Sequence, residues 1–140
     1  MTHPLFTVFT PTYNRAHTIG RVYESLKVQT FRDFEWLVVD DGSKDNTKDV
    51  IKGFAREADF PIRYVYKENG GKHTARNLAM RYAEGELFLV LDSDDSCVPE
   101  ALERFAYHWF SIPEERRKEF SGVCALCRTQ SGAIVGKKFP

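Results

Sequence analysis

The sequence predicts an α/β protein, a three-layer α/β/α sandwich in which a mainly parallel sheet lies between helices. Four apolar runs have the length of strands, and segments with helical spacing separate them. Strands joined by helices need crossover connections, which make neighbouring strands parallel. In such sheets ligands bind beyond the carboxyl ends of the strands, where each of these runs is followed by polar residues. The four runs are Leu5–Thr10, Phe34–Val39, Ile62–Tyr66 and Glu86–Leu91.

The segments between the strands carry apolar residues three and four positions apart, a spacing that places them on one face of a helix. Pro99 suits the first position of the fourth helix, where an N–H would have no partner. A fifth strand is expected at Gly122–Thr129. The expected helices and their inward residues are Thr18–Gln29 with Ile19, Val22, Tyr23 and Leu26, then Thr47–Ala58 with Val50, Ile51, Phe54 and Ala58, then Thr74–Ala83 with Ala75, Leu78, Ala79 and Tyr82, and a helix after Pro99 with Leu102, Phe105, Ala106 and Trp109.

Length and charge limit the classes of function. A chain of 140 residues fits a single domain spanning residues 1–140. Its 20 basic and 20 acidic residues cancel, so we expect no nucleic-acid partner. The longest uncharged apolar run, Leu87–Leu91, is far shorter than the ~20 residues of a membrane span. The first residues lack a signal-peptide pattern. Reduced cysteines suit the cytoplasm, which is the expected location, with peripheral attachment at the inner membrane face left open.

The three cysteines do not predict a disulfide framework. Cys124 and Cys127 form a C-x-x-C pair, which can bind zinc or carry redox chemistry. However, the expected strand would point positions three apart to opposite faces, and no second Cys or His pair has zinc-site spacing. We therefore interpret these cysteines as buried, reduced, small apolar residues.

The residues after the first two strands are typical of a nucleotide site. Thr10–Arg15 includes Tyr13, an aromatic ring that can stack on a base. The second strand ends in Asp40 and Asp41, and two adjacent carboxylates repel each other. Such a carboxylate can accept the N–H of a base or a ribose hydroxyl. Ordinary surface packing of Tyr13, and a turn or helix cap after the aspartates, remain alternatives.

The residues after the third strand are typical of an anion site. Gly70 and Gly71 precede a helix, so the backbone can approach a ligand at the end of the helix that favours anions. Lys72 and Arg76 lie four positions apart and share one helix face. A glycine turn flanked by two solvated cations is the alternative.

The fourth strand is followed by three aspartates. Asp92 and Asp94 share one side if the strand alternation continues, and Asp95 lies in the following turn. Mg²⁺ or Mn²⁺ binds oxygen ligands and often takes only one or two carboxylates, with substrate phosphates and water completing its shell. This cluster predicts a divalent metal site.

Together the four clusters resemble, in order and spacing, the motifs of family 2 glycosyltransferases, which have the GT-A fold, a Rossmann-like sandwich. The resemblance covers about residues 4–110, and the four motifs together are far more specific than any one of them. The residues that carry it are Thr10–Arg15, Val39–Thr47, Gly70 and Gly71 with Ala75–Asn77, and Asp92–Asp95.

The resemblance implies a nucleotide-diphosphate sugar donor, by family habit a UDP-sugar, and a metal, Mg²⁺ or Mn²⁺. It also implies transfer of a hexose with inversion to a hydroxyl of a glycan or lipid-linked acceptor, as in cell-surface polysaccharide biosynthesis. The residues it places at the donor are Tyr13 on the base, Thr10 and Pro11 around it, Asp41 hydrogen-bonded to the base with Asp40 close by, Lys72 or Arg76 at the ribose or diphosphate, Asp92 and Asp94 as the D-x-D pair that holds the metal, and Asp95 as their rival for it.

The chain departs from the family in ending at Pro140, where relatives continue into the part that supplies the catalytic base and most acceptor contacts. We expect a truncated donor-binding portion with the base beyond Pro140, since Glu114 and Glu115 are interpreted as solvated helix-surface residues and His108 as a partly buried helix residue. Apolar surface left by truncation makes a homodimer an open expectation. A nucleotide-sugar-binding fragment without catalysis is one alternative. A haloacid-dehalogenase-like phosphatase is another, because its D-x-D also follows an apolar strand.

Overall fold

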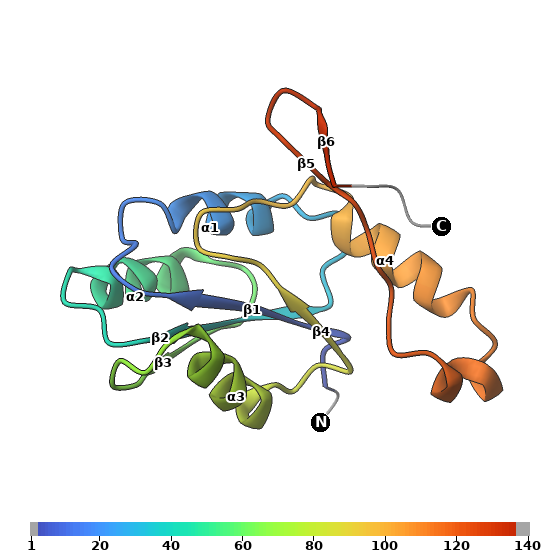
Figure 1. Cartoon of the computed structure of the whole chain (residues 1–140), viewed down its shortest axis with the longest axis horizontal. Coiled ribbons are helices and arrows are strands. Elements are labelled where there is room, and N and C mark those ends of the chain that lie inside the picture. The colour runs from blue at the N-terminus through green and yellow to red at the C-terminus, as the bar shows by residue number, and fades with distance from the viewer. Residues whose placement is uncertain (1–2, 137–140) are drawn as a thin grey trace. The chain divides into compact units, whose positions relative to one another are not determined.

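The computed structural model describes residues 3–136 and divides the chain into two compact units, Met1–Glu103 and Arg104–Pro140 (Figure 1). The first unit holds the sheet and three complete helices. Among the described residues, no helix is long and apolar enough to cross a membrane. The elements are β1 Phe6–Thr12, α1 Gly20–Lys27, β2 Phe34–Asp40, α2 Thr47–Glu57, β3 Ile62–Tyr66, α3 Lys72–Tyr82, β4 Leu87–Val90, α4 Ala101–Phe110, the 3₁₀ helix η1 Glu114–Glu119, β5 Cys127–Arg128 and β6 Ile134–Val135.

The main sheet is parallel throughout and has the strand order β3-β2-β1-β4. Phe6 of β1 is paired with Phe34 of β2 on one side and with Leu87 of β4 on the other. Because β1 and β2 lie in the middle, every residue of both strands is buried. The carboxyl ends of β1, β2 and β4 therefore meet at one edge of the sheet, where ligands bind in this architecture.

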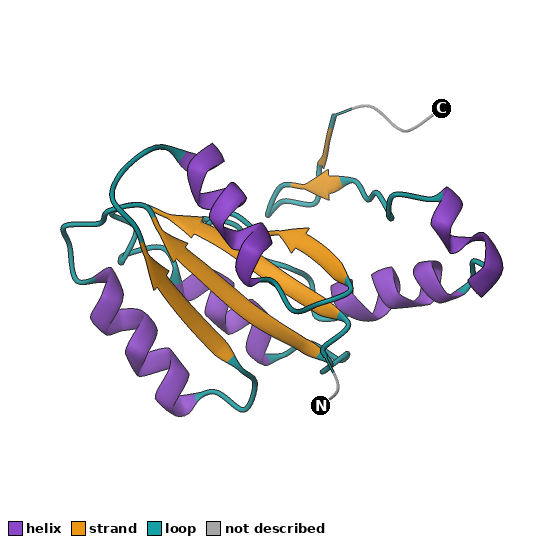
Figure 2. Cartoon of the chain, turned by 90° about the horizontal axis from the view of Figure 1, so that it is seen from below, coloured by secondary structure: helices purple, strands orange, loops and turns teal. Residues whose placement is uncertain are grey.

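Helices cover both faces of the sheet (Figure 2), which confirms the predicted α/β/α layers. On one face, Tyr23 of α1 and Phe54 of α2 stack with Trp36 of β2. On the other face, Ala75 and Ala79 of α3 complete a buried cluster with side chains from β1 and β2. The alternation of β2 explains this arrangement, because Trp36 points to one helix layer and its neighbour Leu37, which belongs to the α3 cluster, points to the other.

The predicted helices form with small shifts of their ends, but the inward position predicted for Tyr82 is wrong. Tyr82 is exposed, because it is the last residue of α3 and lies past the cluster that buries Ala75 and Ala79. In the first helix the four residues predicted to face inward are all buried: Ile19, Val22, Tyr23 and Leu26.

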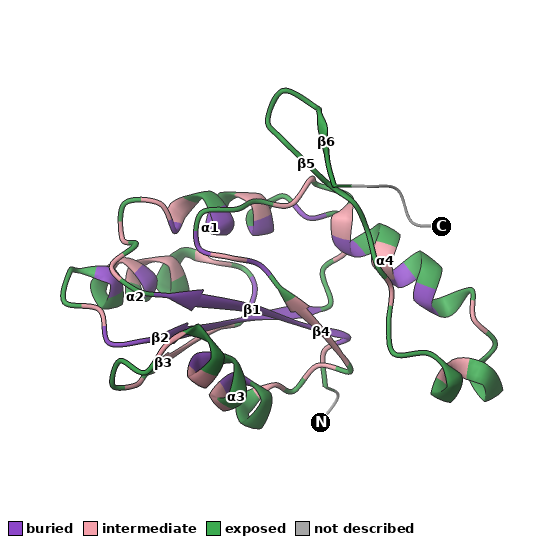
Figure 3. Cartoon of the chain, in the orientation of Figure 1, coloured by how far each residue is buried: buried purple, intermediate pink, exposed green. Residues whose placement is uncertain are grey.

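The fifth strand predicted at Gly122–Thr129 is wrong as a strand of the main sheet. Only Cys127–Arg128 is extended and paired there, in a two-residue antiparallel ladder with β6. Gly132 has φ 92° and allows the tight turn between the two short strands. Cys124 and Cys127 are exposed, so the interpretation of both as buried is also wrong. Figure 3 shows β5 and β6 in the colour of exposed residues. Because this segment buries no side chain, the alternation of its residue types does not correspond to a strand with one face on a core.

An ion pair between β2 and β3 has a buried carboxylate. Glu35 is 3% exposed and accepts two hydrogen bonds from the guanidinium of Arg63 on β3, at 2.9 and 3.1 Å. It also accepts the hydroxyl of Thr7 on β1 at 2.7 Å and the N–H of Glu84 at 3.0 Å. One carboxylate thus joins three strands to the α3–β4 connection. Gly85 in that connection donates its N–H to the Thr7 hydroxyl at 2.8 Å.

Candidate functional site

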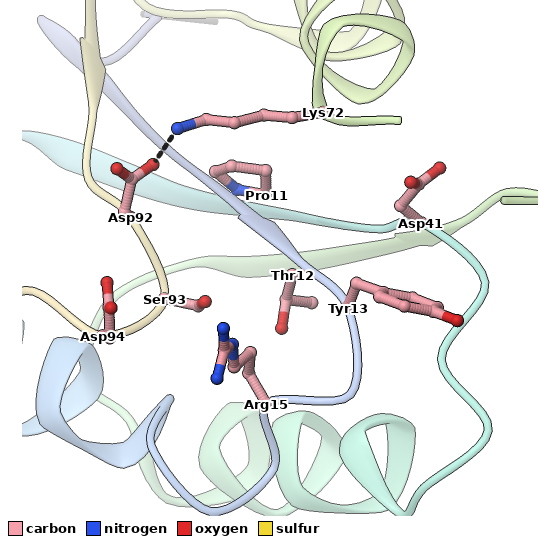
Figure 4. A pocket seen from close by; sticks show the side chains of 9 residues that line it. All are labelled: Pro11, Thr12, Tyr13, Arg15, Asp41, Lys72, Asp92, Ser93 and Asp94. Carbon is pink, nitrogen blue, oxygen red and sulfur yellow. Dashed lines mark hydrogen bonds and ion pairs between the residues drawn. The ribbon is translucent and has the colours of Figure 1, made fainter. Parts of the chain in front are cut away.

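A pocket of about 270 Å³ opens at the carboxyl edge of the main sheet (Figure 4). β1 and the loop after it supply one wall, and the first residue after β2 supplies another. The start of α3 and the residues after β4 complete the lining. The residues that line it are Pro11, Thr12, Tyr13, Arg15, Asp41, Lys72, Asp92, Ser93 and Asp94.

Backbone geometry holds the Tyr13 ring open at the pocket. Asn14 has φ 52°, a left-handed conformation that asparagine tolerates better than most residues. Its N–H donates to the hydroxyl of Ser43 at 2.8 Å, and its side-chain oxygen accepts the N–H of Lys44 at 2.8 Å. The loops after β1 and β2 are therefore joined directly beside Tyr13, a residue that is 46% exposed and available for stacking.

Asp41 anchors the loop between β3 and α3. It is buried, and its carboxylate accepts Lys67 Nζ at 2.7 Å and the N–H groups of Gly70 and Gly71 at 2.9 and 2.8 Å. Burial alone would raise the pKa of Asp41, but these hydrogen bonds outweigh it and hold the pKa below its ordinary value of 3.8. The glycine pair thus binds this carboxylate in the structure, and this contact fixes where α3 begins.

Replacing Asp41 with asparagine is expected to destabilise the chain by about 2 kcal/mol at pH 7. The amide NH₂ would replace a carboxylate oxygen and would then face the N–H and ammonium donors that this oxygen accepts. Since folding lowers the pKa of Asp41, its stabilisation is complete above the unfolded pKa and is lost as the pH falls through the folded value. The difference between the two proteins should therefore shrink on acidification. Urea unfolding at several pH values measures it.

The exposed Asp49 at the start of α2 offers the matched control. Asp49→Asn should change the free energy of unfolding by less than about 1 kcal/mol, the range of an exposed charge at a helix N-terminus. Equal unfolding curves for wild type and Asp41→Asn would mean that this carboxylate does not hold the loop.

Two residues predicted at the donor site have internal partners and do not line the pocket. Asp40 is buried and accepts the N–H of Ser43 at 2.8 Å and the hydroxyl of Tyr64 at 2.5 Å. Burial and the hydrogen bond to Asp40 raise the pKa of Tyr64. Thr10 is buried and accepts the indole N–H of Trp36 at 2.9 Å. Both side chains thus support the edge of the sheet through hydrogen bonds inside the protein.

The cations predicted from α3 differ in position. Lys72 lines the pocket and forms an ion pair with Asp92, its ammonium 2.6 Å from a carboxylate oxygen. Both side chains are largely exposed, so water screens this pair and a charged ligand can exchange with either partner. Arg76, one turn further along α3, is exposed and is not part of the pocket lining.

The three aspartates after β4 are not equivalent. Asp94 lines the pocket, is exposed and forms no ion pair with any residue from 3 to 136. Asp95 lies outside the lining and donates its N–H to the carbonyl of Asp92 in a turn. Burial, followed by the charges of Asp94 and Asp92, raises the pKa of Asp95. Asp94 is the carboxylate most available to a ligand.

No three Asp, Glu, His or Cys side chains within the described part of the chain come together as metal ligands. Asp92 and Asp94 both line the pocket, however, and Asp94 forms no ion pair with any residue from 3 to 136. Mg²⁺ and Mn²⁺ need no more than one or two protein carboxylates when phosphates and water supply the other oxygens. The residues present fit a cation that is bound together with a phosphorylated ligand.

Sequence reasoning missed three residues of the lining as site residues: Thr12, Arg15 and Ser93. The strand alternation would have turned Ser93 away from Asp92 and Asp94. That alternation stops at Val90, where β4 ends, and the following residues form a turn. Thr12 and Arg15 lie in the first polar cluster, where Tyr13 was the more conspicuous residue.

The pattern of the family described as glycosyl transferase family 2 matches residues 7–114, which include every residue of the pocket. This chain belongs to that family. An uncharacterized glycosyltransferase of Rickettsia typhi is 36% identical over 100 residues, covering 71% of this chain and 30% of that protein. The chain thus spans about a third of the length of this curated relative.

Two solved structures share the fold of this family member. The solved structure of Staphylococcus aureus TarS 1-349 in complex with UDP has a TM-score of 0.69 and 34% identity, covering 76% of this chain and 32% of that solved chain. The mannosyltransferase PcManGT from Pyrobaculum calidifontis, in complex with GDP-Man and Mn²⁺, has a TM-score of 0.62 and 33% identity, covering 67% and 28%. Both likenesses confirm the α/β fold predicted from the sequence.

Proposed function

We propose that this chain is the donor-binding portion of an inverting glycosyltransferase that uses a UDP-sugar with Mg²⁺ or Mn²⁺. The observation that carries the proposal is one pocket that combines an exposed aromatic ring, a cation and a carboxylate without an ion pair among residues 3–136: Tyr13, Lys72 and Asp94. A base, a diphosphate and a metal ion need these three kinds of contact. The complexes of TarS with UDP and of PcManGT with GDP-Man and Mn²⁺ support the ligand class.

In this proposal the Tyr13 ring stacks on the base beside Asp41, and the diphosphate extends toward Lys72. Lys72 exchanges its contact with Asp92 for a phosphate oxygen and so stabilises the negative charge that grows on the departing diphosphate. Asp94, with Asp92, would hold the divalent cation, which supplies further stabilisation of that charge when bound. The acceptor hydroxyl attacks the opposite face of the sugar, which inverts the anomeric carbon.

We assign the role of general base to none of the residues from 3 to 136. None of His108, Glu114 and Glu115 lines the pocket, and its carboxylates Asp41, Asp92 and Asp94 are assigned to the donor and the metal. This observation favours one second candidate, a fragment that binds the donor without transferring the sugar. The phosphatase alternative is disfavoured, because its D-x-D motif belongs after a first strand and the chain belongs to a transferase family.

Replacing Asp94 with alanine is expected to weaken UDP binding at least about tenfold in the presence of Mn²⁺, because a charge-assisted contact is lost. Calorimetric titration of UDP with and without Mn²⁺ measures this change, and Asp49→Ala, an exposed carboxylate outside the pocket, should bind as wild type does. If wild type binds UDP equally with and without Mn²⁺, the metal part of the proposal fails.

Release of UDP from UDP-GlcNAc separates the two candidates. A working transferase should release UDP slowly by transfer to water and faster with an acceptor. A binding fragment should show the same titration and release none.

A further inference from the structure

One buried hydroxyl at the pocket has no hydrogen-bond partner within the described range 3–136. β1 carries three buried threonines, and two of them are satisfied, Thr7 by Glu35 and Gly85 and Thr10 by Trp36. Thr12, the last residue of β1, is 3% exposed, and its hydroxyl oxygen contacts no donor or acceptor among the described residues. The exception thus occurs at the one threonine of this strand that lines the pocket.

A buried hydroxyl without a partner destabilises the folded state, because folding removes its hydrogen bonds to water and replaces them with none. Valine has nearly the same shape as threonine and would fill this position without that loss. Packing therefore does not explain a hydroxyl here. A ligand that supplies the missing partner does explain it, and the pocket is where such a ligand would lie.

The surroundings of Thr12 indicate the chemistry of that partner. Figure 4 shows the hydroxyl groups of Thr12 and Ser93 and the guanidinium of Arg15 turned toward the same part of the pocket. Arg15 is exposed and forms no ion pair with the residues from 3 to 136, so its side chain can turn to admit a ligand. Two hydroxyls and a cation together suit oxygen atoms, either of a phosphate or of a ribose.

We propose that the Thr12 hydroxyl forms a hydrogen bond with an oxygen atom of the ribose-diphosphate part of the bound nucleotide, beside Arg15 and Ser93. This inference rests on the proposed function, since it deepens the description of the same pocket. It makes Thr12 a ligand-contacting residue in addition to a residue of the buried strand. The contact becomes available only when nucleotide is bound, so the free protein carries the unpaired hydroxyl.

Thr12→Val and Thr12→Ser test the contact by calorimetric titration with UDP, UMP and uridine in the presence of Mn²⁺. Thr12→Val should weaken UDP binding about five- to tenfold, the range for one lost hydrogen bond. Thr12→Ser, which keeps the hydroxyl, should stay within about twofold of wild type on the same grounds. A loss that persists with uridine assigns the oxygen to the ribose, and a loss that requires a phosphate assigns it to the diphosphate.

Thermal unfolding without nucleotide gives an independent readout. Thr12→Val should unfold at the same or a higher temperature than wild type, because it removes an unpaired buried hydroxyl. A lower unfolding temperature would overturn the inference, since it would reveal an internal partner. Equal UDP affinity for wild type and Thr12→Val would overturn it and leave the proposed function standing. Failure of the wild type to bind UDP would overturn the proposed function and this inference together.

Discussion

Replacing Gly85 with alanine is expected to destabilise the chain by about 3 kcal/mol, because the new methyl group would overlap the backbone of β1. A Cβ atom at this position would lie 2.3 Å from the nitrogen of Thr7 and 2.5 Å from the carbonyl carbon of Phe6. Neither atom can move without shifting the central strand of the sheet. The hydrogen bond from Gly85 to the Thr7 hydroxyl would be strained as well. Urea unfolding at 25 °C measures the loss.

Gly53 provides the matched control for the same chemical change. It lies within α2, and a Cβ atom there would meet nothing within 4 Å. Gly53→Ala should therefore stabilise the chain by about 0.5–1 kcal/mol, since alanine is the better helix former. If both variants shift stability in the same direction, the close approach of Gly85 to β1 does not determine the result.

Replacing Glu35 with alanine is the second change expected to have a large effect, a loss of about 3 kcal/mol at pH 7. The substitution leaves Arg63 without its carboxylate and leaves Thr7 and the N–H of Glu84 without an acceptor. Arg63 is about one third exposed and can recover water, which keeps the loss below that of a fully buried cation. Denaturant unfolding of both proteins gives the difference.

The pH dependence of that difference identifies its source. Burial raises the pKa of Glu35, but hydrogen bonds from Arg63, Glu84 and Thr7 outweigh this and leave it below its ordinary value of 4.5. Its stabilisation is therefore complete above the unfolded pKa and is lost as the pH falls through the folded one. Glu57→Ala, which removes an exposed ion pair with Lys27, should cost less than about 1 kcal/mol. A gap between Glu35→Ala and wild type that stays constant down to pH 3 would contradict this account.

The sheet and its helix layers could be predicted because each element depends on a local pattern. Ile62–Tyr66 was predicted with the bounds it has in the structure, since Pro61 precedes this run and the charged Lys67 follows it. Because ligands bind beyond the carboxyl ends of parallel strands, Tyr13, Lys72 and Asp94 were expected close together. All three line one pocket. Periodicity and topology were sufficient for this much.

Partners that come from neighbouring strands could not be predicted. Thr10 binds Trp36, and Asp40 binds Tyr64, through side chains that are distant in sequence and meet only in the observed strand order. The segment Gly122–Thr129 failed for a different reason. Alternating residue types predict a strand only when a second surface is present to bury one face, and the exposed Cys124 and Cys127 show that none of the described chain covers them.

The hydrogen bonds that join Asn14 to Ser43 and Lys44 bear on the thermodynamics of ligand capture. Ordering a free loop residue costs about 1–2 kcal/mol of backbone entropy, and a flexible site incurs this cost each time it binds a ligand. Here two hydrogen bonds within the chain already cross-link both loops beside Tyr13, so folding has absorbed that cost. Nucleotide binding should then proceed as docking to a preorganised surface, with a small entropic penalty from the backbone.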